Sequence, residues 1–349
     1  MNAAANRNKH TRQMLAFANY LFDLINPFPL IFLFLTLQIG ILGCTPKNNH
    51  VVQIKLGDWA VNDAHFSSAG ILALSVSQDI GIYNLNGELL HLIKLPEPQG
   101  IWQLSWQESN QLWFYDQYRL YHWHLGAESI SPALLFETDI IRQISANSLG
   151  LMLATEGGSV LWYASEQSGL LQPPRTLLEN QPGISTLGFI QQQPYVATTK
   201  GELWLWEDNR YSTVSYFKVE QPIQAVFSMN DQLLALTSRY NNPLATSNTL
   251  SLWQLNKNGA PQAYQLSNST GVFSHLVVGD TLIIGGSNSA WQSFNLANQQ
   301  QTKGALSTRN PNQQARIIAL YNQPNVIVML TSRGEMQIWQ KLGILNHRQ

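Results

Sequence analysis

From residue 51 onward, hydrophobic and polar residues alternate with a period of two in a series of short segments. Alternation of this kind over four to eight residues predicts half-buried β-strands. Gly, Pro, Asn and Asp recur at short intervals between the segments and predict turns. No stretch of the sequence after residue 50 has the 3.6-residue periodicity of an amphipathic helix. The pattern therefore predicts an all-β protein.

A larger unit of the same pattern recurs seven times. Each copy has an apolar strand, a polar turn, a second apolar strand, another turn, and a strand that ends in an aromatic residue. These aromatic positions follow one another at intervals of 39–47 residues, close to the roughly 40–45 residues of a four-stranded propeller blade. The spacing predicts a seven-bladed β-propeller over residues 51–341. The aromatic residues, interpreted as structural anchors of the blades, are Tyr83, Trp123, Trp162, Trp206, Trp253, Phe294 and Trp339.

The predicted ring also needs a strand that closes it. The segment VVQIKL at 51–56 precedes the first copy and belongs to none of the seven units. Only ten residues follow Trp339, too few for a further strand and turn packed in a blade. We therefore expect 51–56 to form the outer edge of the seventh blade, which removes a long unpaired strand edge.

The first copy, HFSSAGILALSVSQDIGIYNLNGE at 65–88, resembles the WD-repeat (Trp-Asp repeat) β-propeller family. It has that family's order of a strand, a Ser-rich turn with Gly, an apolar strand, an Asp turn and a third strand. Asp79 takes the position of the turn Asp, and Tyr83 replaces the Trp that ends the third strand. The resemblance extends over about residues 51–341 and implies the propeller fold.

The N-terminal region has the pattern of a secretory signal. Residues 27–43 read PFPLIFLFLTLQIGILG, without a charged residue, and end at Cys44, the only cysteine of the chain. Residues 1–13 have no acidic side chain but carry Arg7, Lys9, His10 and Arg12. A basic segment followed by an apolar stretch and small residues is typical of an exported protein.

The segment Ile41-Leu42-Gly43-Cys44 resembles the bacterial lipobox. The resemblance implies a lipid on the Cys44 sulfur and cleavage before this residue. An uncleaved membrane anchor and an ordinary cleaved signal are the alternatives. Because Thr45 rather than Asp follows the cysteine, the resemblance implies the periplasmic face of the outer membrane. We thus expect a signal peptide at 1–43, a tether at 44–50, the propeller at 51–341 and a C-terminal tail at 342–349.

Composition excludes several classes of protein. The net charge is −1, and only 12% of the residues are charged, against about a quarter in an ordinary soluble domain. This balance argues against nucleic acid as a partner, because such binding relies on positive charge. A hydrophobic content of 44% excludes a disordered chain, and a single cysteine excludes a disulfide framework.

The sequence contains no recognisable catalytic motif. No Gly-rich phosphate loop and no Gly-x-Ser-x-Gly segment is present, and the carboxylates are scattered. His122 and His124 have the spacing of two metal ligands on one face of a strand, but no third ligand is identifiable. We therefore expect no metal, no cofactor and no enzymatic activity.

Two segments are candidates for contact with another protein. Trp291 lies in the loop-like context SNSAWQS and is a candidate interface aromatic. The longest repeat contains the polar insertion 239–249, whose candidate interface residues are Tyr240, Asn241 and Asn242.

The sequence as a whole predicts a monomeric, membrane-tethered scaffold in the bacterial cell envelope that binds other envelope proteins. The alternatives are a propeller lipoprotein of outer-membrane protein assembly and a metal-dependent hydrolase or lyase centred on the propeller channel.

Overall fold

The computed structural model describes residues 50–57, 59–76, 79–95, 103–135, 139–165, 172–207, 214–238, 248–256, 260–269, 271–306 and 315–341. All of them belong to one compact unit, Asn49–Gln349. The predicted signal peptide, Cys44 and the tail at 342–349 lie outside the described residues. Within the part that is described, no helix is long and apolar enough to cross a bilayer.

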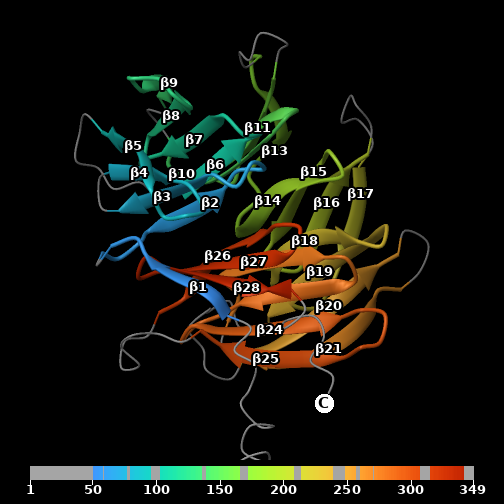
Figure 1. Cartoon of the computed structure of the whole chain (residues 1–349). Coiled ribbons are helices and arrows are strands. Elements are labelled where there is room, and N and C mark those ends of the chain that lie inside the picture. Colours follow the sequence, from blue (N-terminus) through green and yellow to red (C-terminus); the bar gives the residue numbers. More distant parts are fainter. Residues whose placement is uncertain are drawn as a thin grey trace, which may run out of the picture. The chain divides into compact units, whose positions relative to one another are not determined.

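The unit is a β-propeller of seven antiparallel, four-stranded sheets, as the sequence predicts (Figure 1). From the inner to the outer strand, blades 1 to 3 are β2 (Asp63–Phe66), β3 (Leu72–Val76), β4 (Asp79–Tyr83) and β5 (Leu89–Lys94); β6 (Gln103–Gln107), β7 (Gln111–Tyr115), β8 (Arg119–His124) and β9 (Ser131–Leu135); and β10 (Ile141–Asn147), β11 (Gly150–Thr155), β12 (Val160–Ala164) and β13 (Arg175–Leu178).

Blades 4 to 6 are β14 (Ile184–Ile190), β15 (Gln193–Thr198), β16 (Glu202–Trp206) and β17 (Val214–Lys218); β18 (Ile223–Met229), β19 (Gln232–Ser238), β20 (Asn248–Leu255) and β21 (Gln262–Ser269); and β22 (Ser274–Val278), β23 (Thr281–Gly285), β24 (Ala290–Asn295) and β25 (Gln301–Ala305). Blade 7 is β26 (Ile317–Asn322), β27 (Val326–Thr331), β28 (Glu335–Gln340) and β1 (His50–Lys55). Each inner strand contacts the inner strands of both neighbouring blades, so the sheets form a closed ring.

The first strand of the propeller closes the ring, which confirms the prediction for 51–56. β1 pairs antiparallel with β28, with His50 opposite Trp339 and Lys55 opposite Glu335. The turn between β4 and β5 of blade 1 packs against β1. In this turn Gly87 has a φ of 81°, and a Cβ there would collide with the side chain of Ile54. The closing strand is therefore fixed by blade 1 as well as by its own sheet.

The hydrophobic core lies between the blades. The buried side chains form seven clusters, and each cluster contains residues from two adjacent blades. The middle strands of a blade are buried on both faces, because both faces of the sheet pack against neighbours. A single blade cannot bury its own apolar surface, so stability comes from the ring as a whole.

Six of the predicted anchors lie on the same face of their blades. Tyr83, Trp123, Trp206 and Phe294 are buried in the cluster shared with the preceding blade, and Trp253 and Trp339 pack half-buried at its edge. Trp162 is also buried, but it packs toward the following blade. Tyr163, one residue later, takes the position that faces the preceding blade. The predicted phase of the third repeat is therefore shifted by one residue.

Candidate ligand-binding site at the inner strands

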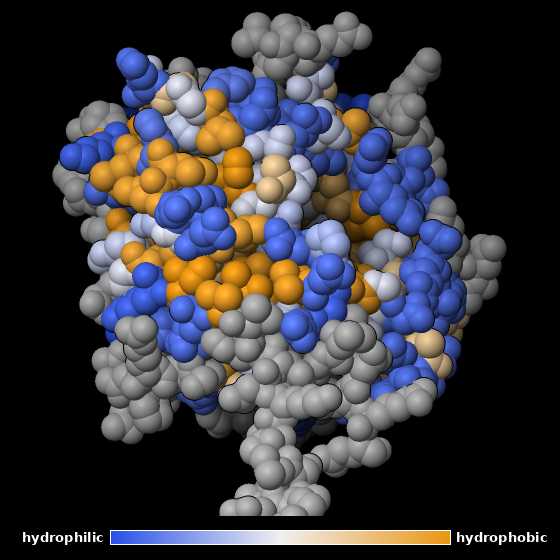
Figure 2. Space-filling model, in the orientation of Figure 1, coloured by the Kyte–Doolittle hydropathy of each residue, from blue (hydrophilic) through white to orange (hydrophobic). Residues whose placement is uncertain are grey.

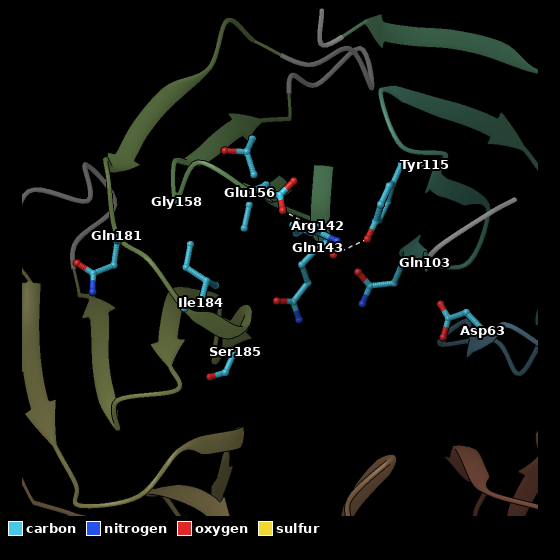
Figure 3. A pocket seen from close by; sticks show the side chains of 13 residues that line it. Asp63, Gln103, Tyr115, Arg142, Gln143, Glu156, Gly158, Gln181, Ile184 and Ser185 are labelled. Atoms are coloured by element: carbon cyan, nitrogen blue, oxygen red, sulfur yellow. Dashed lines mark hydrogen bonds and ion pairs between the residues drawn. The ribbon is translucent and has the colours of Figure 1, made fainter. Parts of the chain in front are cut away.

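A pocket of about 570 Å³ lies where the inner strands of blades 1 to 4 begin. It is lined mostly by polar side chains and backbone, and Figure 3 shows these side chains around one open space. We call this site the inner-strand pocket. Its polar side chains include Asp63, Gln103, Tyr115, Arg142, Gln143, Glu156, Gln181 and Ser185.

A recurring β-bulge places two of these side chains. In β10, β14, β18 and β26 the register with the next strand shifts at the second residue, so one extra residue is inserted. The extra residues are Arg142, Ser185, Gln224 and Ile318. A bulge redirects the side chain of the inserted residue. In β10 and β14 that side chain lines the pocket, and the buried Oγ of Ser185 has no hydrogen-bond partner among the described residues.

Asp63 and Gln103 connect adjacent blades in the same way. The Oδ2 atom of Asp63 on β2 accepts a hydrogen bond from the backbone N–H of Leu104 on β6, at 2.7 Å. One blade further on, the Oε1 atom of Gln103 accepts from the backbone N–H of Ile144 on β10, at 2.9 Å. We call this contact the inter-blade latch. It fixes the relative height of neighbouring inner strands at the pocket.

A second row of contacts lies two residues further along the same strands. The Nδ1 atom of His65 accepts from the N–H of Trp106 at 3.2 Å, and the Oγ atom of Ser105 accepts from the N–H of Ala146 at 2.9 Å. Desolvation by the surrounding protein lowers the pKa of His65 to about 4. The imidazole is therefore neutral at pH 7 and available as an acceptor.

Asp63 is a carboxyl of the pocket with a raised pKa. Desolvation raises its pKa from 3.8 to about 6, and the N–H groups of Leu104 and Ala64 offset only part of this rise. Tyr115 points to the same region, and its hydroxyl donates to the carbonyl of Arg142. Burial, and secondarily the charge of Asp63, raises the pKa of Tyr115. A carboxyl with a raised pKa in a cleft is a frequent feature of functional sites.

The other charges of the pocket are paired with each other. The guanidinium of Arg142 forms an ion pair with the carboxylate of Glu156, and both side chains are about half exposed. When Asp63 is ionised, the pocket therefore holds two carboxylates and one guanidinium.

His122 and His124 lie on one face of β8, as the sequence predicts, with ring centroids 4.4 Å apart. His122 stacks on Trp113 at 4.3 Å. Burial, with a smaller effect of His124, lowers the pKa of His122 to about 4. Across the described ranges, no group of three or more His, Cys, Asp or Glu side chains is placed to hold a metal ion.

The prediction that Trp291 is an exposed interface residue is wrong. Trp291 is the second residue of β24, and its side chain is only 4% exposed. Its ring contacts Trp339 of blade 7 edge-on, with centroids 6.2 Å apart. Both faces of this strand are covered by neighbouring blades, so the tryptophan is a core residue. The other candidate interface residues, Tyr240, Asn241 and Asn242, lie outside the described residues.

Exposed apolar side chains gather instead on the outer strand of blade 1. Leu89, Leu90 and Leu92 on β5 are 52%, 50% and 42% exposed. We call these three residues the β5 patch. Figure 2 shows hydrophobic surface in the region of β5. A free edge strand with exposed leucines is an unusual surface for a soluble protein and is typical of a protein contact.

Comparison with known proteins supports the fold and nothing narrower. No family model and no curated protein matches the chain. Among solved structures, the chain is similar to the computationally designed Ika8 protein, with a TM-score of 0.57 and 12% sequence identity. The similarity covers 83% of this chain and 99% of the designed one. The fold class is therefore the β-propeller.

The inner-strand pocket is not predicted by the hydrophobic pattern of the sequence. A signal was present, because Asp63, Gln103 and Gln143 follow one another at intervals of 40 residues, each at the start of a repeat. Aligning the seven copies would have shown one acidic residue where the next two copies have amides.

Proposed function

We propose that this protein is a WD-repeat-like lipoprotein, anchored through Cys44, that serves as a non-enzymatic protein-binding scaffold in the bacterial cell envelope. The single observation that carries the binding function is the β5 patch on a rigid seven-bladed ring. Propellers present wide, rigid faces, and their functions reside in surface sites rather than in the fold. A leucine-rich edge strand offers both apolar area and free backbone groups to a partner.

The proposed cellular location is inferred from the sequence. An uncharged run ends at the only cysteine, and the strand that closes the ring begins six residues later, at His50. A lipid on Cys44 would hold the propeller near the membrane surface. We propose the periplasmic face of the outer membrane, a monomeric state and envelope proteins as partners.

The test of the binding function is site-specific photo-crosslinking in intact cells. A photoreactive residue replaces Leu92 in one strain and Tyr216 in another. Tyr216 is a matched control, because it is 52% exposed on β17, the outer strand of blade 4. We expect a defined envelope protein to be crosslinked from position 92 and not from position 216. The same products from both positions, or none from position 92, would contradict the proposal.

The proposed lipid anchor is tested with the variant Cys44→Ser. We expect this variant to lose fatty-acid labelling and to move from the membrane to the soluble fraction. A variant that remains membrane-bound at full length would indicate a transmembrane anchor instead. Turnover of a substrate that is lost on chelation and restored by a metal ion would contradict the non-enzymatic part of the proposal.

A further inference from the structure

The inner-strand pocket has a net negative charge that the fold does not use. We infer that this pocket binds the cationic group of a basic peptide side chain, a guanidinium or an ammonium, with Asp63 as its counter-ion. This inference concerns a site distinct from the β5 patch and is independent of the anchor at Cys44.

The repeat supplies an internal control for the role of Asp63. Gln103 occupies the corresponding position one blade later and makes the same latch, at 2.9 Å instead of 2.7 Å. The latch therefore requires an acceptor oxygen and not a charge. A partly buried carboxylate costs free energy that a neutral amide avoids. The charge of Asp63 is thus left for a role other than holding the blades together.

No neighbouring group neutralises Asp63. Among the described residues it takes part in no ion pair. On its own strand, His65 is neutral at pH 7 because its pKa is lowered to about 4. Tyr115 at the end of β7 is neutral because its pKa is raised. The strands that pack against β2, namely β3, β6 and β26, have no charged residue.

Across the pocket, the only guanidinium that lines it is already paired. Arg142 forms its ion pair with Glu156, which also lines the pocket. An incoming cation would therefore meet one unpaired carboxylate, that of Asp63, and no unpaired positive charge among the lining residues. Coulombic attraction of this kind is stronger in a partly desolvated site than at an open surface.

The remaining groups of the pocket suit the amides that flank a peptide side chain. Gln143 and Gln181 can both donate and accept hydrogen bonds, and the unpartnered hydroxyl of Ser185 offers one more such group. In Figure 3, Gln143 and Ser185 lie on the side of the open space opposite Asp63. A volume of about 570 Å³ accommodates a long side chain together with its adjoining peptide groups.

Binding of a cation must be linked to the titration of Asp63. The carboxyl has a pKa of about 6 in the free protein, and a cation beside it favours the ionised form. Affinity should therefore be high above pH 7 and fall as the carboxyl becomes protonated. From pH 7.5 to pH 5.0 the ionised fraction of a group with this pKa falls about tenfold, so affinity should fall about tenfold as well.

The test is calorimetric titration of the full-length protein in detergent with two short peptides. The first is N-acetyl-Gly-Arg-Gly-amide, and the second has citrulline, the neutral isostere, in place of arginine. We expect the arginine peptide to bind at pH 7.5 at least tenfold more tightly than the citrulline peptide. Its affinity should fall about tenfold at pH 5.0, whereas that of the citrulline peptide should not change.

Two variants separate the charge from the latch. Asp63→Asn and Asp63→Gln both keep an acceptor oxygen, and Gln is the residue that makes the latch in the next blade. We expect neither variant to have a lower melting temperature than the wild type, and both to bind the two peptides equally weakly. Asp231→Asn, a carboxylate in the turn between β18 and β19, is the control and should bind like the wild type. Equal binding of the two peptides by the wild type, no binding of the arginine peptide, or an arginine preference that persists in the folded Asp63 variants would overturn the inference.

Discussion

Replacement of Trp123 by Ala should remove a large part of the packing between blades 1 and 2. The indole is 1% exposed and stacks on His91 of β5, with ring centroids 5.2 Å apart. Its Nε1–H donates to the carbonyl of Ala127 at 3.0 Å. A buried aromatic side chain covers about 200 Å². At about 25 cal/mol per Å² this area corresponds to about 5 kcal/mol, an upper estimate because unfolded chains already bury part of their surface.

Emptying a large aromatic site typically costs about 3–5 kcal/mol, so we expect a loss in this range for Trp123→Ala. Trp123→Phe keeps most of the ring but removes the donor to Ala127, and it should cost about 1–2 kcal/mol. The measurement is the denaturant midpoint of each variant at pH 7.5, followed by fluorescence and by circular dichroism. Tyr216→Ala is the control, because Tyr216 is exposed on an outer strand. A loss for Trp123→Ala no larger than that of the control would refute the placement of the anchors between the blades.

Three further predictions concern the β1–β28 pairing that closes the ring, the buried Trp291 and the carboxyl of Asp63. Deleting residues 50–56 should lower the melting temperature far more than deleting 343–349, because only the first deletion removes the partner of β28; equal effects of the two deletions would contradict the closure of the ring by β1. Trp291→Ala should destabilise the fold by about 3–5 kcal/mol, as expected for a core residue, and a denaturant midpoint close to that of the wild type would show that the side chain is not buried. Asp63 has a raised pKa in the folded state, so its contribution to stability is greatest below about pH 4 and is lost as the pH rises through about 6. Asp63→Asn should therefore gain stability relative to the wild type between pH 4 and pH 7.5, and a difference in melting temperature independent of pH would contradict the raised pKa.

The blades could be predicted from the sequence because their signals are local. Strand alternation and turn residues lie within a few positions of each other, and the seven aromatic residues mark the period. The closure of the ring was predictable as well, since the predicted strand at 51–56 belongs to none of the seven repeats. Both features depend on the order of elements along the chain and not on which way a side chain points.

The direction of the side chains could not be predicted in the same way. The central strands of each blade are covered on both faces, so apolar residues occupy consecutive positions and alternation no longer marks a face. Trp162 and Tyr163 are both buried for this reason, and alternation offers no basis for choosing between them. The burial of Trp291 was missed for a different reason, because its polar neighbours resemble those of a loop.

The inner-strand pocket depends on contacts between blades. Its shape comes from bulges at the start of β10 and β14 and from a latch that joins residues 41 positions apart. Neither feature leaves a mark in hydrophobic periodicity. Asp63 carries a charge and Gln103 does not. This difference can be interpreted only when the structure shows that both side chains make the same inter-blade latch.

The closing strand has a consequence for the order of folding. Lys55 pairs with Glu335, 280 positions later in the chain, so the first strand to be synthesised must wait for the last one. At a synthesis rate of roughly 5–20 residues per second, this delay is roughly 15–60 seconds. During that interval β1 has no partner strand, and six blades can form before the ring closes. Ring closure is then a late, long-range step, and β1 stays without a partner strand until the final blade has been made.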